Sequence, residues 1–547
     1  MAAHIETGTM VAPCYRSQTL DHLGLVAGMY EEIGIGAKID QVIEQDSDKR
    51  QLTLGQAVKA MVLNGLGFVN QRLYLMPKFF WDKPTNRLIG EGIQPEHLND
   101  DVLGRALDAL YAFGVTELYA LIAPQAVERL GLEVRFAHFD STGFHVDGDY
   151  NSETGAEDGV IHLTRGYSRD HRPDLNQAVL QLIVDRQAGL PLLMQPLDGN
   201  AEDKTHFRQT LQAYLGQLCT TYQLEYIVAD SALYTAETLP LLQETGWLTR
   251  VPATLKAAQE ALRAADPETM TRLDEQTRYQ RLTSDYAGVP QRWLVVYSEA
   301  AHQRALKSVA RHCLKQTEAD AKALARLGAQ SFACVADAEQ ALAAFQNKLT
   351  LTTVAEYRIV AISHYHGRGR PAQDRQPDAV TYQIEAVLAS LPAEYTARLH
   401  QHSSFILATN QLDTEALSDA QLLQAYKDQQ RVERGFRFLK DPLFLASSLY
   451  LKSPKRIMAL MLVMTLCLLV YAALEHRIRE RLHTHRKTFP HQTGKPVQNP
   501  TARWVLQYFV GIHLLILADG QELVLNLNEH HQSLLELLGQ AYEAFYS

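Results

Sequence analysis

The chain has 547 residues, enough for two to four domains, and its composition of 46% hydrophobic and 21% charged residues is that of an ordinary globular protein. Its net charge of −10, taken alone, argues weakly against a nucleic-acid partner. The five cysteines are scattered without a Cys-x-x-Cys pair, which argues against a disulfide framework or a cysteine zinc site and fits reduced thiols in a cytoplasmic protein.

Positive charge is concentrated in one part of the chain. Residues 426–487 contain thirteen Lys or Arg and five Asp or Glu, a local charge of +8, so the rest of the chain carries −18. A basic region on an acidic body is compatible with DNA binding through one face of the protein.

Residues 1–125 are predicted to form a small α-helical domain. Apolar residues recur at helical spacing in residues 54–63 and 101–110. Asn99 or Asp100 is the predicted N-cap of the second of these helices. No clear helix-turn-helix signature is present in this domain.

From residue 126 to 252 the pattern changes to strands with a ribonuclease-H-like order. The first predicted strand covers residues 134–140, with an expected continuation at 143–147. The next strands are predicted at 177–184, 190–197, 224–230 and 247–252, with a helix at 205–218. The first strand ends at Asp140 and the fourth ends at Asp230. In the ribonuclease-H-like α/β fold, acids at the ends of the first and fourth strands lie side by side.

The remaining chain is predicted to form three further regions. Residues 253–400 alternate Ala-rich helices (256–264, 302–327 and 336–349) with short strands (292–297 and 357–363), which indicates an inserted α+β domain. Residues 401–475 return to the ribonuclease-H-like core with a strand at 405–410. Residues 476–547 are mostly helical.

An uncharged run of eighteen residues, 457–474, is long enough to be considered as a membrane span. Cations flank it at both ends, so it carries no orientation signal. A protein of this size can also bury such a helix completely. We interpret the run as a buried core helix and expect no membrane partner; the alternative is a membrane anchor.

Residues 426–440 have the pattern of an amphipathic helix. At about 100° per residue, one stripe contains Tyr426, Gln429, Gln430, Glu433, Arg437 and Lys440. Val432, Phe436 and Leu439 form the adjoining apolar stripe. A single carboxylate among cations and amides suits a site for a metal ion and a phosphate backbone, whereas the simpler interpretation is a solvated helix face.

Asp140, Asp230 and Glu433 are the candidate catalytic acids and metal ligands. Carboxylates that converge on one spot repel each other and need a counter-charge. Two Mg²⁺ ions would supply it and would suit phosphodiester chemistry, in which an attacking and a leaving oxygen are both stabilised. Acids at strand ends are common in α/β proteins. The interpretation therefore rests on the presence of all three acids together, and not on any one of them.

These motifs together resemble the DDE transposases of bacterial insertion sequences, in the group with a Tyr-x-x-Arg-x-x-x-Glu-x-x-x-x-x-x-Lys signature. Tyr426, Glu433 and Lys440 match it at the right spacing, and Gln429 stands where the group has Arg. Further similar segments are Asp140-Ser141-Thr142, Gly166 to Gln177, Asp198-Gly199-Asn200 with Asp203-Lys204-Thr205, and Val228-Ala229-Asp230-Ser231-Ala232. The long gap from Asp230 to Glu433 matches the domain that this group inserts there.

The resemblance implies a transposase with a ribonuclease-H-like core, an α+β insertion and a preceding helical domain. It implies metal-dependent cleavage at insertion-sequence ends and strand transfer into target DNA, with two Mg²⁺ ions for which Mn²⁺ can substitute. The implied ligands are Asp140, Asp230 and Glu433, and the implied DNA contacts are Tyr426, Gln429, Arg431, Arg437 and Lys440. The implied partners are terminal inverted repeats and target DNA, bound by a homodimer on paired ends in the cytoplasm.

Several alternatives stay open at this point. The chain could be a catalytically inactive, transposase-derived DNA-binding protein, although all three acids are present. The N-terminal domain is hypothesised to recognise DNA ends, with oligomerisation or core packing as the alternative. Arg368-Gly369-Arg370-Pro371 has the form of a minor-groove hook or of a solvated turn. The pairs His364-x-His366 and His483-x-His485 are interpreted as solvated or core histidines, and Asp198 with Asp203 as a structural turn.

Overall fold

The computed structural model describes residues 15–45, 51–68, 73–146, 159–166, 172–366, 375–429, 435, 451 and 453–547. The chain divides into two compact units: unit 1 comprises Met1–Trp247 and Leu423–Ser547, and unit 2 comprises Leu248–Leu422. In sequence, unit 2 is therefore an insertion within unit 1. The finer division into five regions stays a prediction.

The N-terminal part of unit 1 is helical, as predicted. Its helices are α1 (Leu23–Ile33), α2 (Ile35–Val42), α3 (Leu54–Gly65), α4 (Met76–Phe80), α5 (Thr85–Leu88), α6 (Asp100–Phe113) and α7 (Val115–Leu130). Asn99 caps α6 as predicted, because its side chain accepts a hydrogen bond from the Val102 N–H at 3.1 Å. Thr53 caps α3 in a reciprocal capping box with Gln56. These caps provide partners for backbone groups at the helix starts.

The strand order of unit 1 confirms the predicted ribonuclease-H-like core. β2 (Phe136–Val146), β3 (Asn176–Asp185) and β4 (Pro191–Leu197) are antiparallel neighbours, and β5 (Tyr226–Ala229) pairs parallel to β2 on its other side. The order is β4-β3-β2-β5, followed by β6 (Gly246–Arg250), whose first residues belong to unit 1. α8 (Asp203–Tyr222) precedes β5 in the chain. The first strand thus lies beside the fourth, as this fold requires.

β2 is one continuous strand, which joins the predicted strand at 134–140 to its expected continuation at 143–147. Every residue from Ala137 to Val146 pairs with β3. Ser141 and Thr142 are buried within the sheet, so polar residues at these positions do not interrupt the strand. Asp140 therefore lies inside a strand and not at its end, and β5 is the strand that ends at this level. Ser141 and Thr142 pair with Gln181 and Leu180 of β3, and the β-branched Thr142 favours a strand.

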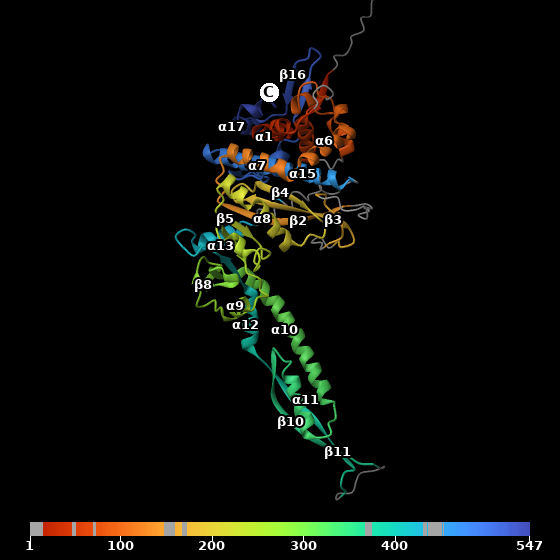
Figure 1. The fold of residues 1–547 in the computed structure, drawn as a ribbon, viewed down its shortest axis with the longest axis vertical. Coiled ribbons are helices and arrows are strands. Elements are labelled where there is room, and N and C mark those ends of the chain that lie inside the picture. The colour runs from red at the N-terminus through yellow and green to blue at the C-terminus, as the bar shows by residue number, and fades with distance from the viewer. Residues whose placement is uncertain are drawn as a thin grey trace, which may run out of the picture. The chain divides into compact units, whose positions relative to one another are not determined.

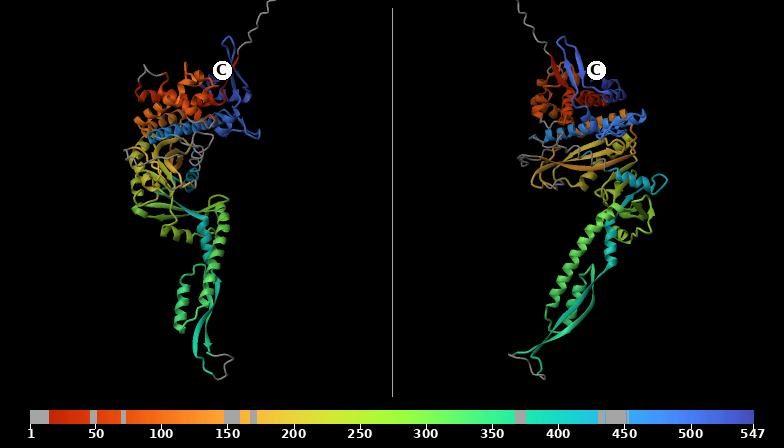
Figure 2. Two further views of the ribbon diagram at one scale, coloured as in Figure 1. Left: turned by 90° about the vertical axis from the view of Figure 1, so that its right-hand side faces the viewer. Right: turned by 180° about the vertical axis from the view of Figure 1, so that it is seen from behind.

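A long apolar helix, α15 (Pro454–Thr484), runs between the N-terminal helices and the sheet of unit 1 (Figures 1 and 2). It contacts α1, α3, α6, α7 and β4. Among the described residues it is the one helix long and apolar enough to cross a membrane, unless the sharply bent pair α6 and α7 counts as a second span; 94% of its apolar window is buried. This burial confirms the predicted core helix.

The C-terminal segment of unit 1 packs on the N-terminal helices. Its elements are β13 (Phe489–Pro490), β14 (Pro496–Val497), α16 (Ala502–Tyr508), β15 (His513–Ile516), β16 (Glu522–Leu525), α17 (Glu529–Leu538) and α18 (Gln540–Glu543). β15 pairs with the N-terminal strand β1 (Arg16–Thr19). Tyr542 is buried against α1, where Gly28 permits the approach because a Cβ there would lie 2.6 Å from the Tyr542 ring. One hydrophobic core therefore joins the first helices, α15 and the last helices.

Unit 2 combines strands with long helices, as predicted for the α+β insertion. Its elements after β6 are α9 (Lys256–Ala264), β7 (Thr271–Arg272), β8 (Thr277–Ser284), β9 (Gln291–Ser298), α10 (Glu299–Gly328), α11 (Val335–Gln346), β10 (Thr352–His364), β11 (Ala379–Ser390), α12 (Pro392–Ser403), β12 (Ser404–Thr409) and the start of α13 (Asp419–Lys427). The strands β6, β12, β9, β8 and β7 are successive neighbours. β10 and β11 form a separate antiparallel hairpin beside α10 and α11 (Figure 1).

Candidate active site

Two of the three predicted acids lie at adjacent positions of neighbouring strands. In the parallel pair of β2 and β5, Phe139 stands opposite Ala229. Asp140 directly follows Phe139, and Asp230 directly follows Ala229. Residues at the same register of adjacent strands point to the same face of a sheet, and neighbouring strands lie about 4.8 Å apart. The structure therefore places the two aspartates at neighbouring positions of the sheet, each directly after the Phe139–Ala229 pair.

Backbone N–H groups hold both carboxylates. The Ser141 N–H donates to Asp140 Oδ1 at 2.8 Å, and the Ala232 N–H donates to Asp230 Oδ1 at 2.9 Å. Both aspartates are half-buried, so their side chains are partly shielded from water and still reachable by a ligand. Hydrogen bonds from a rigid backbone to a charged oxygen fix the side-chain orientation. Two carboxylates held in this way fit a divalent cation, because Mg²⁺ prefers carboxylate oxygens.

The third predicted acid, Glu433, lies outside the described residues, as do Arg431, Arg437 and Lys440. Within the described part of the chain, no group of three or more His, Cys, Asp or Glu side chains is arranged to bind a metal. The described site therefore consists of two acids, and the assignment of the third rests on the sequence signature.

Tyr426 and Gln429 lie at the end of α13. α13 ends at Lys427, and Asp428 and Gln429 form a turn in which the Gln429 N–H donates to Tyr426 O at 3.1 Å. Within the described residues the predicted helical segment 426–440 is interrupted after Lys427, and residues 430–434 and 436–440 lie outside the described residues. Both Tyr426 and Gln429 are half-buried.

Asp428 is tied to the strand next to the one that carries Asp140. Its Oδ2 accepts from Arg186 Nε at 2.6 Å, and its Oδ1 accepts from Gln424 Nε2 at 3.0 Å. Arg186 directly follows β3; its backbone N–H donates to Phe136 O at 3.2 Å, and its guanidinium lies 5.1 Å from the centroid of the Phe136 ring. The Asp428 side chain is only 10% exposed, so water weakens this ion pair little. The pair ties the turn after Tyr426 to the start of β2.

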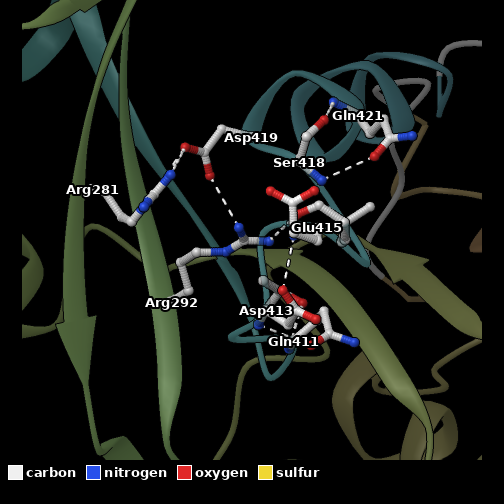
Figure 3. A network of polar contacts seen from close by, with 10 residues as sticks. Arg281, Arg292, Gln411, Asp413, Glu415, Ser418, Asp419 and Gln421 are labelled. Carbon is white, nitrogen blue, oxygen red and sulfur yellow. Dashed lines mark hydrogen bonds and ion pairs between the residues drawn. The ribbon is translucent and has the colours of Figure 1, made fainter.

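A second set of polar contacts fixes the start of α13 (Figure 3). Asp419 accepts from Arg281 Nη2 at 2.6 Å, and Arg292 Nη1 lies 3.2 Å from its other oxygen. Ser418 and Gln421 form reciprocal hydrogen bonds of 2.9 and 3.2 Å, a capping box that the Ser-x-x-Gln pattern could have indicated. The Arg292 and Asp419 side chains are 3% and 4% exposed. Neither the ion pair of Asp419 with Arg281 nor that of Asp428 could be predicted from the sequence, because the partners lie 138 and 242 positions away along the chain.

The weaker sequence motifs have structural roles where they are described. Asp198 begins a turn in which the Ala201 N–H donates to Asp198 O at 3.0 Å, and its Oδ1 accepts from the His162 N–H at 2.8 Å. The His364 ring lies 2.7 Å from the Thr381 hydroxyl across the β10–β11 hairpin. His483 is exposed near the end of α15. The Arg368-Gly369-Arg370-Pro371 hook lies outside the described residues.

The strand order defines a ribonuclease-H-like core in which Asp140 and Asp230 lie at neighbouring positions. The family described as "Transposase DDE domain" matches residues 135–470, and the chain belongs to this family. Residues 15–124 match a family described as a domain of unknown function.

Solved structures and curated proteins were compared as well. The piggyBac transposase synaptic complex with hairpin DNA is similar at 9% identity and a TM-score of 0.35, over 89% of this chain and 79% of that chain. The Mos1 transposase paired-end complex with the left transposon end is similar at 9% identity and a TM-score of 0.15, over 38% of this chain and 62% of that chain. No curated protein matches the chain.

Proposed function

We propose that this protein is a transposase that cuts DNA strands at the ends of an insertion sequence and joins the freed ends to target DNA. The observation that carries this proposal is the side-by-side position of Asp140 and Asp230 on β2 and β5, in a chain of the DDE transposase family. Glu433 completes the set of acids through its signature spacing from Tyr426 and Lys440. The active form in this proposal is a cytoplasmic homodimer on two paired DNA ends.

Asp140, Asp230 and Glu433 would hold two Mg²⁺ ions, for which Mn²⁺ can substitute. Bound there, the ions would activate the attacking oxygen and stabilise the leaving oxygen of a phosphodiester. The Ser141 and Ala232 N–H groups keep the two aspartates oriented before DNA arrives. A preoriented site needs no reorganisation at the moment of reaction, which lowers the barrier.

The proposed reaction consists of two phosphoryl transfers at one site. First, a water oxygen bonds to phosphorus while the bond from phosphorus to the 3′ oxygen breaks, and that oxygen takes up a proton. The new 3′-hydroxyl then attacks a target phosphodiester, loses its proton to solvent and displaces the target's 3′ oxygen. Tyr426, Gln429, Arg431, Arg437 and Lys440 are the residues we propose to hold the DNA backbone or a displaced base.

The proposed role of the N-terminal helices is recognition of the terminal repeats. Tyr74, Lys78 and Trp81 follow one another at helical spacing around α4 and are all exposed, with Trp81 69% and Tyr74 55% exposed. Aromatic rings beside a cation suit base stacking and phosphate contact. Trp81→Ala in the full chain should weaken binding to terminal-repeat duplex about tenfold, and unchanged affinity would exclude this role.

A strand-cleavage assay tests the proposed activity. The substrate is a labelled duplex that contains the inverted repeat flanking the coding region. In Mg²⁺ the wild-type protein should nick it, and Asp140→Asn or Glu433→Gln should lower the rate by about 10³-fold or more, because each removes several kcal/mol of transition-state stabilisation. Equal cleavage by wild type and Glu433→Gln would contradict the mechanism. Binding without cleavage by the wild-type protein would identify an inactive transposase derivative.

A further inference from the structure

The longest helix of unit 2 carries a stripe of positive charge. α10 (Glu299–Gly328) has six exposed basic residues, here called the α10 stripe: Arg304, Lys307, Arg311, Lys315, Lys322 and Arg326. At about 100° per residue, four of them fall within about 40° of one another and all six within about 100°. With a rise of 1.5 Å per residue the stripe is about 33 Å long.

Contacts on the opposite side of α10 fix the direction in which the stripe faces. Ala305 and Val309 are buried in a small apolar cluster with α12. Asp320 is 6% exposed and accepts hydrogen bonds from the Thr352 hydroxyl at the start of β10 and from Gln316, both at 2.8 Å. Because this face is packed and hydrogen-bonded, α10 cannot rotate to bury its basic residues. The stripe is therefore a permanently exposed surface of unit 2.

The charge of the stripe is not neutralised by neighbouring acids. Other arginines of unit 2 are paired: Arg263 with Glu394 at 2.6 Å, and Arg358 with Glu385 at 2.5 Å. No acid of the described chain lies within ion-pair distance of the stripe, and Glu318 is the one acid in its sector of the helix. An ordinary solvated helix face mixes both signs. In a chain with a net charge of −10, six cations gathered on one face favour a negatively charged partner.

We propose that the α10 stripe binds the phosphate backbone of duplex DNA. This inference rests on the proposed function and assigns a DNA contact to the insertion domain. The stripe is about as long as one turn of B-DNA, and a duplex presents one phosphate charge per about 1.7 Å of its axis. The stripe also lacks the apolar anchors that a protein interface needs at its centre, since Ala325 at its edge is the one apolar residue within its sector and Leu314 lies about 20° outside it.

A cavity beside this surface lies between α9, α10 and α12. It encloses about 540 Å³ and is lined by Arg263, Ser308, Val309, His312, Arg398, Gln401 and His402. Ser308 and His312 belong to α10 and follow the first turns of the stripe. Phosphate oxygens accept hydrogen bonds from hydroxyl, amide, imidazole and guanidinium groups. Arg398 and Gln401 can therefore donate to a phosphate beside the stripe, whereas Arg263 is already paired with Glu394.

Two matched charge reversals test the proposal in the full-length protein. Lys315→Glu with Lys322→Glu alters the stripe, and Lys256→Glu with Lys348→Glu changes the net charge of unit 2 equally at exposed positions off α10. The probe is a fluorescein-labelled random-sequence duplex of about one to three helical turns, followed by anisotropy across a salt series. The stripe variant should bind at least tenfold more weakly at 100 mM salt, and its slope of log affinity against log salt should be shallower by about two. The control variant should match the wild type.

Further measurements separate the possible outcomes. Lys315→Arg with Lys322→Arg should restore the wild-type slope, since either cation contacts phosphate. If the stripe variant keeps the wild-type slope but loses self-association in light scattering, the partner is a second copy of the chain and the proposal is overturned. If it keeps the slope while Asp140→Asn still abolishes cleavage, the stripe assignment fails and the proposed function stands. If wild type and Asp140→Asn cleave equally, the proposed function fails instead.

Discussion

Arg186 Nε lies 2.6 Å from Asp428 Oδ2 and joins the end of β3 to the turn that follows Tyr426. Glu433 is five residues further along the chain, so this pair is well placed to set where the Glu433 segment begins. Arg186 and Asp428 are positioning residues in this interpretation. A displacement of a catalytic group by about 1 Å can cost up to about 10² in rate.

We expect Asp428→Asn to slow strand cleavage about tenfold or more while the affinity for terminal-repeat duplex stays within about twofold. Arg186→Ala should have a similar effect, and the double variant should be no worse than either single variant, because the two residues act through one contact. The control is Arg135→Ala, which removes an exposed ion pair with Glu225 in the same unit. Additive losses in the double variant would show that the pair does not act as a unit.

The buried contact between Arg292 and Asp419 should matter more for stability than the exposed one. Asp419→Ala leaves the 3%-exposed Arg292 without this carboxylate, and breaking a buried pair from one side costs about 3–5 kcal/mol. Arg281→Ala removes a half-exposed partner of the same aspartate and should cost about 1 kcal/mol or less. Urea unfolding of unit 2, followed by tryptophan fluorescence, measures both. Equal losses would contradict the ranking.

Replacing one proposed metal ligand with a softer atom should change the metal preference of cleavage. Asp230→Cys should be inactive in Mg²⁺, because a hard cation binds thiolate poorly, and should recover part of its activity in Mn²⁺. EDTA should abolish wild-type cleavage and added Mg²⁺ should restore it. Asp230→Ser serves as the control, since it has a similar size and no thiolate. Recovery of Asp230→Ser in Mn²⁺ to the same extent would argue against direct metal contact at this position.

His22 should make the protein less stable in mild acid. Burial lowers the pKa of His22 from 6.5 to about 4, although its Nε2 lies 2.8 Å from Leu66 O. Between these pH values the unfolded chain binds a proton that the folded chain does not, so the free energy of unfolding falls as the pH falls from 6.5 to 4. The loss due to His22 at pH 4 is about 3 kcal/mol.

The pH dependence of His22→Gln checks this assignment. Burial also lowers the pKa of His476 and of His531, so the wild-type slope contains their contributions with the same sign. The difference between wild type and His22→Gln isolates His22, and the variant should lose less stability on acidification than the wild type. His366→Gln, at an exposed position, should leave the slope unchanged. A slope in His22→Gln equal to that of the wild type would show that His22 titrates normally.

Local pattern was sufficient for elements with strong periodicity. The helix predicted at 256–264 has the bounds of α9, and the hairpin predicted at 177–184 and 190–197 corresponds to β3 and β4. Asp140 and Asp230 could be singled out because each follows a short apolar run. In such segments the spacing of apolar residues and the final structure agree, since both depend on which face meets the core.

Contacts between distant residues could not be read from local pattern. Arg186 and Asp428 are 242 positions apart, and nothing near either residue signals the other. The continuation of β2 through Ser141 and Thr142 depends in the same way on pairing with β3. The apolar run within α15 was ambiguous for a related reason: its composition suits a bilayer or a core, and only the surrounding helices and β4 decide between them.

The central place of α15 also governs how the protein can be made. The ribosome completes the N-terminal helices at Leu130 and reaches Pro454, where α15 begins, more than half a chain length later. At about 5–20 residues per second this interval lasts tens of seconds. Throughout it, the apolar faces that will cover α15 have no partner and are open to aggregation. A gene interrupted before Pro454 would thus yield a chain whose first helices cannot complete their core, and not a smaller protein with part of the function.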